Sequence, residues 1–378
     1  MRVAVDCHMV AQDRAGDAGN ARYAALLARA MAATGTSSDH VTALATNAAT
    51  WEAVGRTATA TVAANDVWRL GRGATRTLTA LDVDVAAFTY VAPPRVPCGL
   101  LLAVHDPSFV THPEWLSPRA RAVLNAAVPR SARAAVLVLA LTRTAKTDLC
   151  AALALDPDRV EVVSPPPDPV FAPREGAAER VRERFGLDRY VVAVGDLGPR
   201  KNLPALAAAM DMLDRDGLEL ALVGAAGREG DDIAARTGAR WLGRVEDAEL
   251  ADLYTAAAVT AYPSLYEGFG LPLVEAMACG SPVVASDRGA IPEVAGGAAI
   301  LTEPAPGAIA EGLAELARGG DVSATRDALK RALDEVRTYY DTGPGSLEPE
   351  PDASIGYLGA IAASTNIVLR GNVSASPL

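Results

Sequence analysis

The segment at residues 264–280, SLYEGFGLPLVEAMACG, carries two carboxylates, Glu267 and Glu275, on either side of a glycine turn. The turn follows an apolar run typical of a strand, and its proline suits the first turn of a helix that ends near Gly280. A glycine loop that leads into a helix lets backbone N–H groups face an anion, and carboxylates accept strongly from sugar hydroxyls. Taken singly, Glu275 could merely complement the helix dipole and Glu267 could be an exposed turn residue. The whole pattern favours a site for an anionic, polyhydroxylated ligand.

Two adjacent cations, Arg200 and Lys201, follow a second strand-like run in the segment VGDLGPRKN at residues 194–202. They stand where a glycine turn leads into a helix that begins near Asn202. Cations at such a position can stabilise the charge that develops on a diphosphate leaving group, without a metal. Two solvated loop cations are the alternative, although Lys201 is one of only three lysines in the chain.

The first half of the chain offers weaker candidates. His105 ends an apolar run at residues 99–105, and the carboxyl ends of strands are where open α/β sheets bind ligands. A lone histidine is more often structural. Gly19 lies in a loop between the first strand-like run and the first helix-like segment, and by itself it indicates little.

Short apolar runs alternate with longer amphipathic segments along most of the chain, as in parallel α/β sheets. The proline-rich run SPPPDP at residues 164–169 interrupts this alternation, and a new series starts at Tyr190. The sequence therefore predicts an α/β protein with two Rossmann-like, doubly wound domains, residues 1–168 and 169–340, facing a cleft. Residues 341–378 are expected to be a linker and an unassigned tail. The expected strands are 2–6, 41–45, 99–105, 135–141, 160–163, 190–194, 218–223, 259–262 and 282–285, and the main expected helices are 20–33, 118–127, 144–154, 202–213 and 246–257.

The length of 378 residues suits two domains, and the charge is uneven between the two parts of the chain. Residues 1–150 carry 15 Lys+Arg and 11 Asp+Glu, whereas the net charge of the whole chain is −11. An acidic protein is a poor candidate for binding nucleic acid through its phosphates. Arg119, Arg121, Arg130 and Arg133 could form a basic face toward an anionic acceptor or a lipid surface, or simply a solvated helix face.

The chain has no apolar run of about 18 residues and no signal-peptide pattern at its start. Its four cysteines are far apart in the sequence, without C-x-x-C spacing. These features predict a cytoplasmic protein with no disulfide framework and no structural zinc.

The motifs resemble those of the large family-four group of retaining GT-B glycosyltransferases, over roughly residues 1–318. That family carries two glutamates separated by seven residues within an E-G-F-G-x-P turn, as at Glu267 and Glu275. It also carries a glycine turn before R-K-N, and a strand that ends in H-D followed by H-P-E-W. The chain departs from the family in its first loop, GDAGNARY at residues 16–23, and in lacking a recognisable closing helix after Leu333.

The resemblance implies a role for each motif. Arg200 and Lys201 would hold the donor diphosphate, Glu275 the ribose and Glu267 the hydroxyls of the donor sugar. His105 would lie near that sugar as a catalytic residue with Glu267, Arg200 and Lys201. The remaining donor-binding positions implied are Gly19 near the phosphates or the acceptor, Val245 near the base, and the turn residues Gly268, Phe269, Gly270 and Leu271.

The implied reaction moves a hexose, mannose-like or related, from a nucleotide-diphosphate sugar to a hydroxyl of a glycan, glycolipid or small molecule, with retention and without metal or cofactor. The composition, rich in Arg and Ala and poor in Lys, suggests a bacterial source. Other sugar-nucleotide enzymes of this fold, such as an epimerase or a phosphorylase, and a non-catalytic sugar-nucleotide-binding protein stay open as alternatives. A nicotinamide dehydrogenase is disfavoured, because the best glycine run, Gly224 to Gly227, lacks the G-x-G-x-x-G spacing.

Overall fold

The structure is a computed structural model that describes residues 1–10, 18–34, 39–46, 58–61, 69–196, 198–213, 217–225 and 238–317. The chain divides into two compact units, with the main boundary between Pro166 and Pro167. The predicted tail at residues 341–378 and most of the first loop, residues 11–17, lie outside the described residues.

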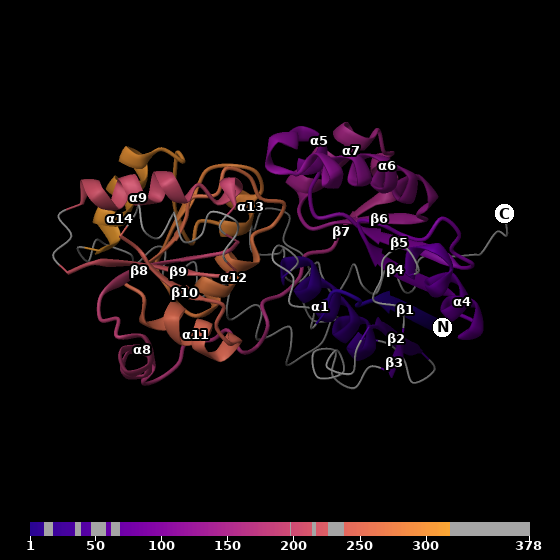
Figure 1. The fold of residues 1–378 in the computed structure, drawn as a ribbon, viewed down its shortest axis with the longest axis horizontal. Coiled ribbons are helices and arrows are strands. Elements are labelled where there is room, and N and C mark those ends of the chain that lie inside the picture. The colour runs from indigo at the N-terminus through magenta and orange to yellow at the C-terminus, as the bar shows by residue number, and fades with distance from the viewer. Residues whose placement is uncertain are drawn as a thin grey trace. The chain divides into compact units, whose positions relative to one another are not determined.

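The first unit is built on a seven-stranded parallel sheet with the order β3-β2-β1-β4-β5-β6-β7 (Figure 1). The chain starts at β1, moves outward to β3, and returns to place β4 on the other side of β1, so the sheet is doubly wound. Its central strands are buried along nearly their whole length, as expected of a sheet covered on both faces. The strands are β1 (Arg2–Asp6), β2 (His40–Ala45), β3 (Ala58–Thr61), β4 (Val85–Thr89), β5 (Gly99–Ala103), β6 (Leu137–Ala140) and β7 (Val160–Val162).

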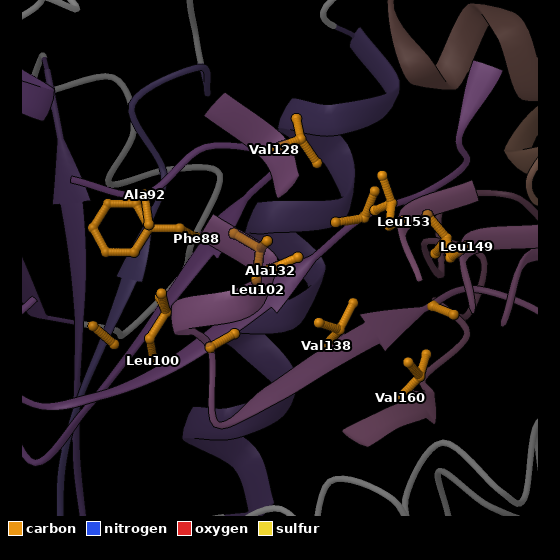
Figure 2. Packing of buried hydrophobic residues seen from close by; sticks show 14 of the residues in the cluster. Phe88, Ala92, Leu100, Leu102, Val128, Ala132, Val138, Leu149, Leu153 and Val160 are labelled. Carbon is orange, nitrogen blue, oxygen red and sulfur yellow. The ribbon is translucent and has the colours of Figure 1, made fainter. Parts of the chain in front are cut away.

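Helices α6 (Pro118–Ala134) and α7 (Arg143–Leu153) connect the last three of these strands and cover one face of the sheet. Both begin with a capping side chain: the hydroxyl of Ser117 accepts from the Ala120 N–H, and that of Thr142 from the Ala145 N–H. Their inner sides pack on the sheet through a core that Figure 2 shows. The other helices of the unit are α1 (Ala18–Thr34), α4 (Ala74–Ala80) and the short α5 (Ser108–Thr111).

The second unit repeats the same winding in a six-stranded parallel sheet of order β10-β9-β8-β11-β12-β13. Helices α9 (Leu203–Met212) and α14 (Pro306–Ala317) pack together on one face, whereas α8 (Ala177–Phe185) packs against α11 (Asp247–Ala256). The strands are β8 (Tyr190–Val194), β9 (Glu219–Val223), β10 (Arg240–Gly243), β11 (Val259–Tyr262), β12 (Val283–Ser286) and β13 (Ile300–Thr302), and the remaining helices are α12 (Leu271–Ala278) and α13 (Ile291–Ala295).

The prediction of two doubly wound parallel sheets is confirmed, and each expected strand and helix has a counterpart within a few residues. Four strands were not expected: β3, β4, β10 and β13. Helix α6 runs past Pro129 to Ala134, beyond the expected end at residue 127. Pro129 costs the helix one N–H donor, and Val128 and Ala132, buried on either side of it, hold the helix against the core. No helix among the described residues is long and apolar enough to cross a membrane.

Candidate functional site

The strand order of the second unit marks where its ligand site should lie. Strands β8 and β11 are neighbours, yet the chain leaves β8 toward β9 and leaves β11 toward β12, in opposite directions. Loops that diverge in this way open a crevice at the carboxyl ends of the two strands. The two motifs that the sequence singles out, Arg200-Lys201 and the turn around Glu267, follow these two strands.

Hydrogen bonds join the two loops to each other. The Leu265 N–H donates to the Arg200 carbonyl at 2.8 Å, and the amide of Asn202 donates to the carbonyls of Pro263 and Pro304 at 3.3 and 2.9 Å. Asn202 adopts a left-handed conformation with φ +55° at the start of α9, a region that asparagine tolerates better than most residues. The positions of both cations are therefore fixed by the backbone of the neighbouring loop.

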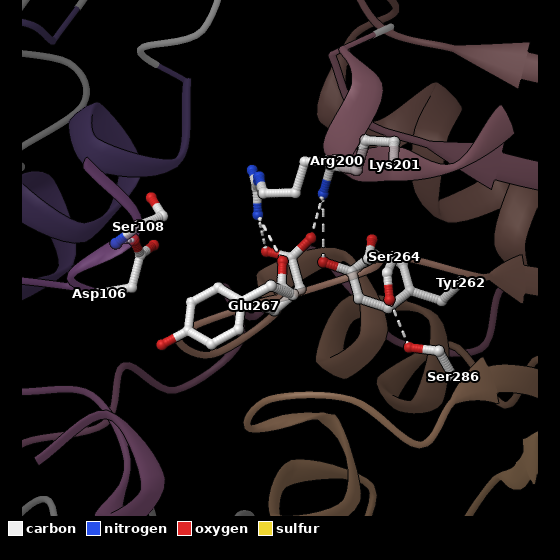
Figure 3. A network of polar contacts seen from close by, with 9 residues as sticks. Asp106, Ser108, Arg200, Lys201, Tyr262, Ser264, Glu267 and Ser286 are labelled. Carbon is white, nitrogen blue, oxygen red and sulfur yellow. Dashed lines mark hydrogen bonds and ion pairs between the residues drawn. The ribbon is translucent and has the colours of Figure 1, made fainter. Parts of the chain in front are cut away.

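The side chains of Arg200, Lys201 and Glu267 form one ionic cluster, shown in Figure 3, in which Lys201 and Glu267 are buried and Arg200 is half-buried. The Lys201 ammonium donates to Glu267 Oε1 at 2.7 Å, and the Arg200 guanidinium pairs with Oε2 of the same carboxylate. Lys201 and Glu267 are 7% and 6% exposed. Buried charges of this kind persist only when each has a partner, and here one carboxylate serves two cations. These three side chains together carry one net positive charge, suited to an anionic ligand, and Asp196 lies near enough for its charge to act on Lys201 as well.

The environment keeps Glu267 ionised. Burial alone would raise the pKa of its carboxyl, but the charges of Arg200 and Lys201 outweigh that effect and lower the pKa from 4.5 to about 2. Burial lowers the pKa of Lys201, and Glu267 opposes that shift. At neutral pH we therefore treat all three groups as charged.

A consequence for stability follows from the lowered pKa of Glu267. The unfolded chain takes up the proton near pH 4.5 and the folded protein only near pH 2, so this stabilisation is present above pH 4.5 and lost as the pH falls toward 2. The shift corresponds to on the order of 3 kcal/mol. We expect the difference in free energy of unfolding between the wild type and Glu267→Gln to shrink across this window in denaturant titrations. A difference that stays constant with pH would contradict the charge assignment.

Two glycines allow the loops of this site to approach closely. Gly224, after β9, has φ +140°, and a Cβ there would lie 1.8 Å from the carbonyl oxygen of Gly195, after β8. Gly195 has φ +155°, and its own Cβ would lie 2.7 Å from Cε of Lys201. Gly224 is thus required by its close approach to the backbone of Gly195.

The other predicted residues of this unit lie around the same loops. Gly270 caps the start of α12 with φ +102°, preceded by the buried Gly268 and Phe269 and followed by the half-buried Leu271. Glu275 is buried at 3% exposure within α12. Val245 is half-buried in the connection between β10 and α11, also beyond the carboxyl end of a strand.

In the first unit, His105 follows β5, and its ring meets those of Tyr23 and Tyr90 with centroid distances of 4.8 and 5.5 Å. Its buried Nε2 has no hydrogen-bond partner in the described part of the chain, nor has the hydroxyl of Tyr23. Burial lowers the pKa of His105 to about 4 against the opposing charge of Asp106, so its imidazole is neutral at pH 7. Gly19 lies exposed in the first turn of α1, where a Cβ would have no atom within 4 Å among the described residues.

The sequence reasoning missed three residues that the structure adds. Tyr262, the last residue of β11, accepts a hydrogen bond from the Lys201 ammonium at 3.3 Å, and its ring centroid lies 4.9 Å from the same group. An aromatic residue directly before the glutamate turn is the signal that could have revealed it. In the first unit, buried His8 pairs with Asp6 at 3.0 Å after β1, a D-x-H pattern that went unnoticed.

Within the described residues, no group of three or more His, Cys, Asp or Glu side chains is arranged to hold a metal ion. What Arg200, Lys201 and Glu267 offer a ligand is electrostatic: two cations and a fixed carboxylate in a largely buried setting, where charges interact more strongly than in water.

Comparison with known sequences supports this interpretation. Residues 188–318 match the family model described as "Glycosyl transferases group 1". The chain is 33% identical over 213 residues to O-antigen chain mannosyltransferase B of Escherichia coli, a match that covers 53% of this chain and 56% of that protein. It is 38% identical over 176 residues to MMP alpha-(1->4)-mannosyltransferase of Mycolicibacterium hassiacum, covering 44% and 41%. The chain thus spans about half the length of these curated relatives.

Solved structures show the same fold. Sucrose-phosphate synthase from Thermosynechococcus elongatus aligns with a TM-score of 0.74 at 19% identity, over 100% of both chains. HepE of Anabaena, solved in complex with UDP and glucose, aligns with a TM-score of 0.68 at 19% identity, over 97% of this chain and 99% of that one. The fold is therefore GT-B, and the stretch from residue 188 to residue 318 matches the model of the glycosyl transferases group 1 family.

Proposed function

We propose that this protein is a glycosyltransferase that moves a hexose from a nucleotide-diphosphate sugar to a hydroxyl acceptor, with retention at the anomeric carbon and without a metal. The observation that carries the proposal is the ionic cluster of Arg200, Lys201 and Glu267 at the carboxyl ends of β8 and β11. The names of the relatives favour a mannose-like sugar and a glycan or glycolipid acceptor.

In this proposal, the oxygens of the donor diphosphate bind Arg200 and Lys201 and replace some of the contacts that these cations make with Glu267. Arg200 offers a planar fork of donors and Lys201 a compact ammonium, and together they stabilise the negative charge of the departing diphosphate. Glu267 then accepts from hydroxyls of the donor sugar, and Glu275 from the ribose. Val245 lies near the base, and the N–H groups of the turn from Gly268 to Leu271 face the ligand.

The transfer itself breaks the bond between the anomeric carbon and the diphosphate oxygen and forms a bond from that carbon to the acceptor oxygen on the same face. The acceptor proton passes to the departing phosphate oxygen, so no protein base is needed. His105, neutral at pH 7, would contribute hydrogen bonding to the sugar rather than charge. Gly19 would let the first-unit helix approach the phosphates or the acceptor.

The test is a thermal-shift screen against UDP, GDP, ADP and dTDP in the presence of a chelator. UDP is included because HepE was solved with it. A nucleotide at 100 times its dissociation constant stabilises the protein by about 2.7 kcal/mol. We expect one nucleotide to stabilise the wild type and Lys146→Ala, a matched lysine change in the first unit, but not Lys201→Ala.

No stabilisation by any nucleotide, or equal stabilisation of Lys201→Ala, would overturn the proposed donor site. The nucleotide identified in this way fixes the donor for activity assays. Product that forms from the donor without any acceptor would point instead to an epimerase, and binding without turnover to a sensor.

A further inference from the structure

The outward side of α6 in the first unit is a basic, partly apolar surface that the proposed reaction does not use. Six exposed residues form it, and we call them the α6 face: Arg119, Ala122, Val123, Ala126, Arg130 and Arg133. We propose that the α6 face docks this protein on the surface of an anionic lipid bilayer.

Packing fixes which side of α6 faces outward. Val128 and Ala132 are fully buried against the sheet, so the helix cannot turn its other side outward without opening the core (Figure 2). The residues of the α6 face are mostly spaced three or four apart, which places them along one side of the helix. From Arg119 to Arg133 this side runs roughly 21 Å. Its arrangement is therefore a fixed feature of the folded unit.

The charge of this region is opposite to that of the chain as a whole. Between Trp115 and Thr147 the sequence contains six Lys and Arg and no Asp or Glu, although the net charge of the protein is −11. In the described part of the chain, the guanidinium groups of Arg119 and Arg133 make no hydrogen bond or ion pair, whereas Arg130 donates to the Ala92 carbonyl at 2.9 Å. An anionic surface would thus be attracted to this side of the molecule in particular.

The apolar residues between the arginines favour a lipid surface over a dissolved polyanion. Val123 is 55% exposed and lies about one helical turn after Arg119, on the same side of α6 as Ala122 and Ala126. A helix that lies in a membrane interface places such side chains against the acyl boundary, while arginine stems cover apolar surface and their heads bind phosphates. A nucleic acid would leave Val123 without a partner. The α6 face therefore combines positive charge with exposed apolar surface, the two features by which a helix binds in the plane of an anionic membrane.

The experiment is co-sedimentation with vesicles of phosphatidylcholine, with and without phosphatidylglycerol. We expect binding only to the anionic vesicles, weakened by salt that shortens the screening length from about 8 Å to about 3 Å. The variant R119E/R133E should bind at least about 25-fold more weakly, since each arginine near a membrane contributes about fivefold. Arg130 is left intact because it also holds the loop at Ala92.

The matched control is R72E/R76E, which makes the same charge change at exposed arginines elsewhere in the first unit. It should bind as the wild type does, and Val123→Asp should bind more weakly at every salt concentration. The melting temperatures of the variants check that each is folded. The proposal is overturned if the wild type does not bind anionic vesicles, if R72E/R76E loses binding equally, or if the protein binds a DNA duplex through the same arginines as tightly as vesicles.

Discussion

Replacing Lys201 by alanine is expected to lower the rate of sugar transfer by about 10²–10³-fold, the usual effect of removing one group that stabilises charge in a transition state. The Lys201 ammonium is buried and donates to Glu267 at 2.7 Å. Because the site is buried, water is a poor substitute for its charge in the variant. Its loss leaves Arg200 as the one remaining cation of the cluster. The measurement is the release of nucleoside diphosphate from the donor in the presence of acceptor.

The fold should survive this substitution, because Glu267 keeps its pairing with Arg200. An unchanged circular dichroism spectrum would show this, and Lys146→Ala should transfer sugar at the wild-type rate. A loss smaller than about threefold in Lys201→Ala would remove Lys201 from the role proposed, since a typical hydrogen bond alone contributes about 1 kcal/mol, or roughly fivefold.

The largest effect on stability is expected from Gly224→Ala, which should lower the free energy of unfolding by about 3–5 kcal/mol. The added Cβ would lie 1.8 Å from the carbonyl oxygen of Gly195, and a backbone group cannot move aside as a flexible side chain can. The backbone at φ +140° adds strain of its own. Urea denaturation of the purified variant, or its absence from the soluble fraction, measures the effect.

Gly297→Ala separates steric clash from backbone strain. Gly297 also has a positive φ, +84°, but nothing among the described residues lies within 4 Å of the position of its Cβ. This variant should therefore lose only about 1–2 kcal/mol. If the two variants lost the same free energy of unfolding, the close approach of Gly224 to Gly195 would contribute nothing to the effect of Gly224→Ala.

The sequence predicted the winding of both sheets because most strands are short apolar runs between helical segments. The strands that it missed lack that signature. Strand β3 has the sequence ATAT, β10 is a half-exposed edge strand, and β13 is an edge strand of three residues. Strand β4, VAAFT, is fully buried, but two alanines in its centre give it no clear β propensity. Pairing with β1 and β5 decides its structure, and such long-range pairing is invisible in a local pattern.

The sequence predicted which residues form the candidate site better than it predicted the contacts between them. The motifs identified Arg200, Lys201 and Glu267, and the structure brings these three together. The sequence did not indicate that one carboxylate holds both cations, because that depends on two loops joined by the Arg200–Leu265 hydrogen bond. Tyr262 was missed for the same reason. Its contact with Lys201 arises only because β11, which ends at Tyr262, pairs with β8, the strand that precedes Lys201.

The pairing of β8 with β11 also bears on how this site comes into being. These strands are separated along the chain by β9 and β10, so their contact closes a long loop, a slow step in folding compared with helix formation. Arg200 and Lys201 belong to the half of the sheet made first, and Glu267 to the half made later. During synthesis the two cations therefore exist for a time without their carboxylate, and the ionic cluster matures only when the two halves of the sheet pair with each other.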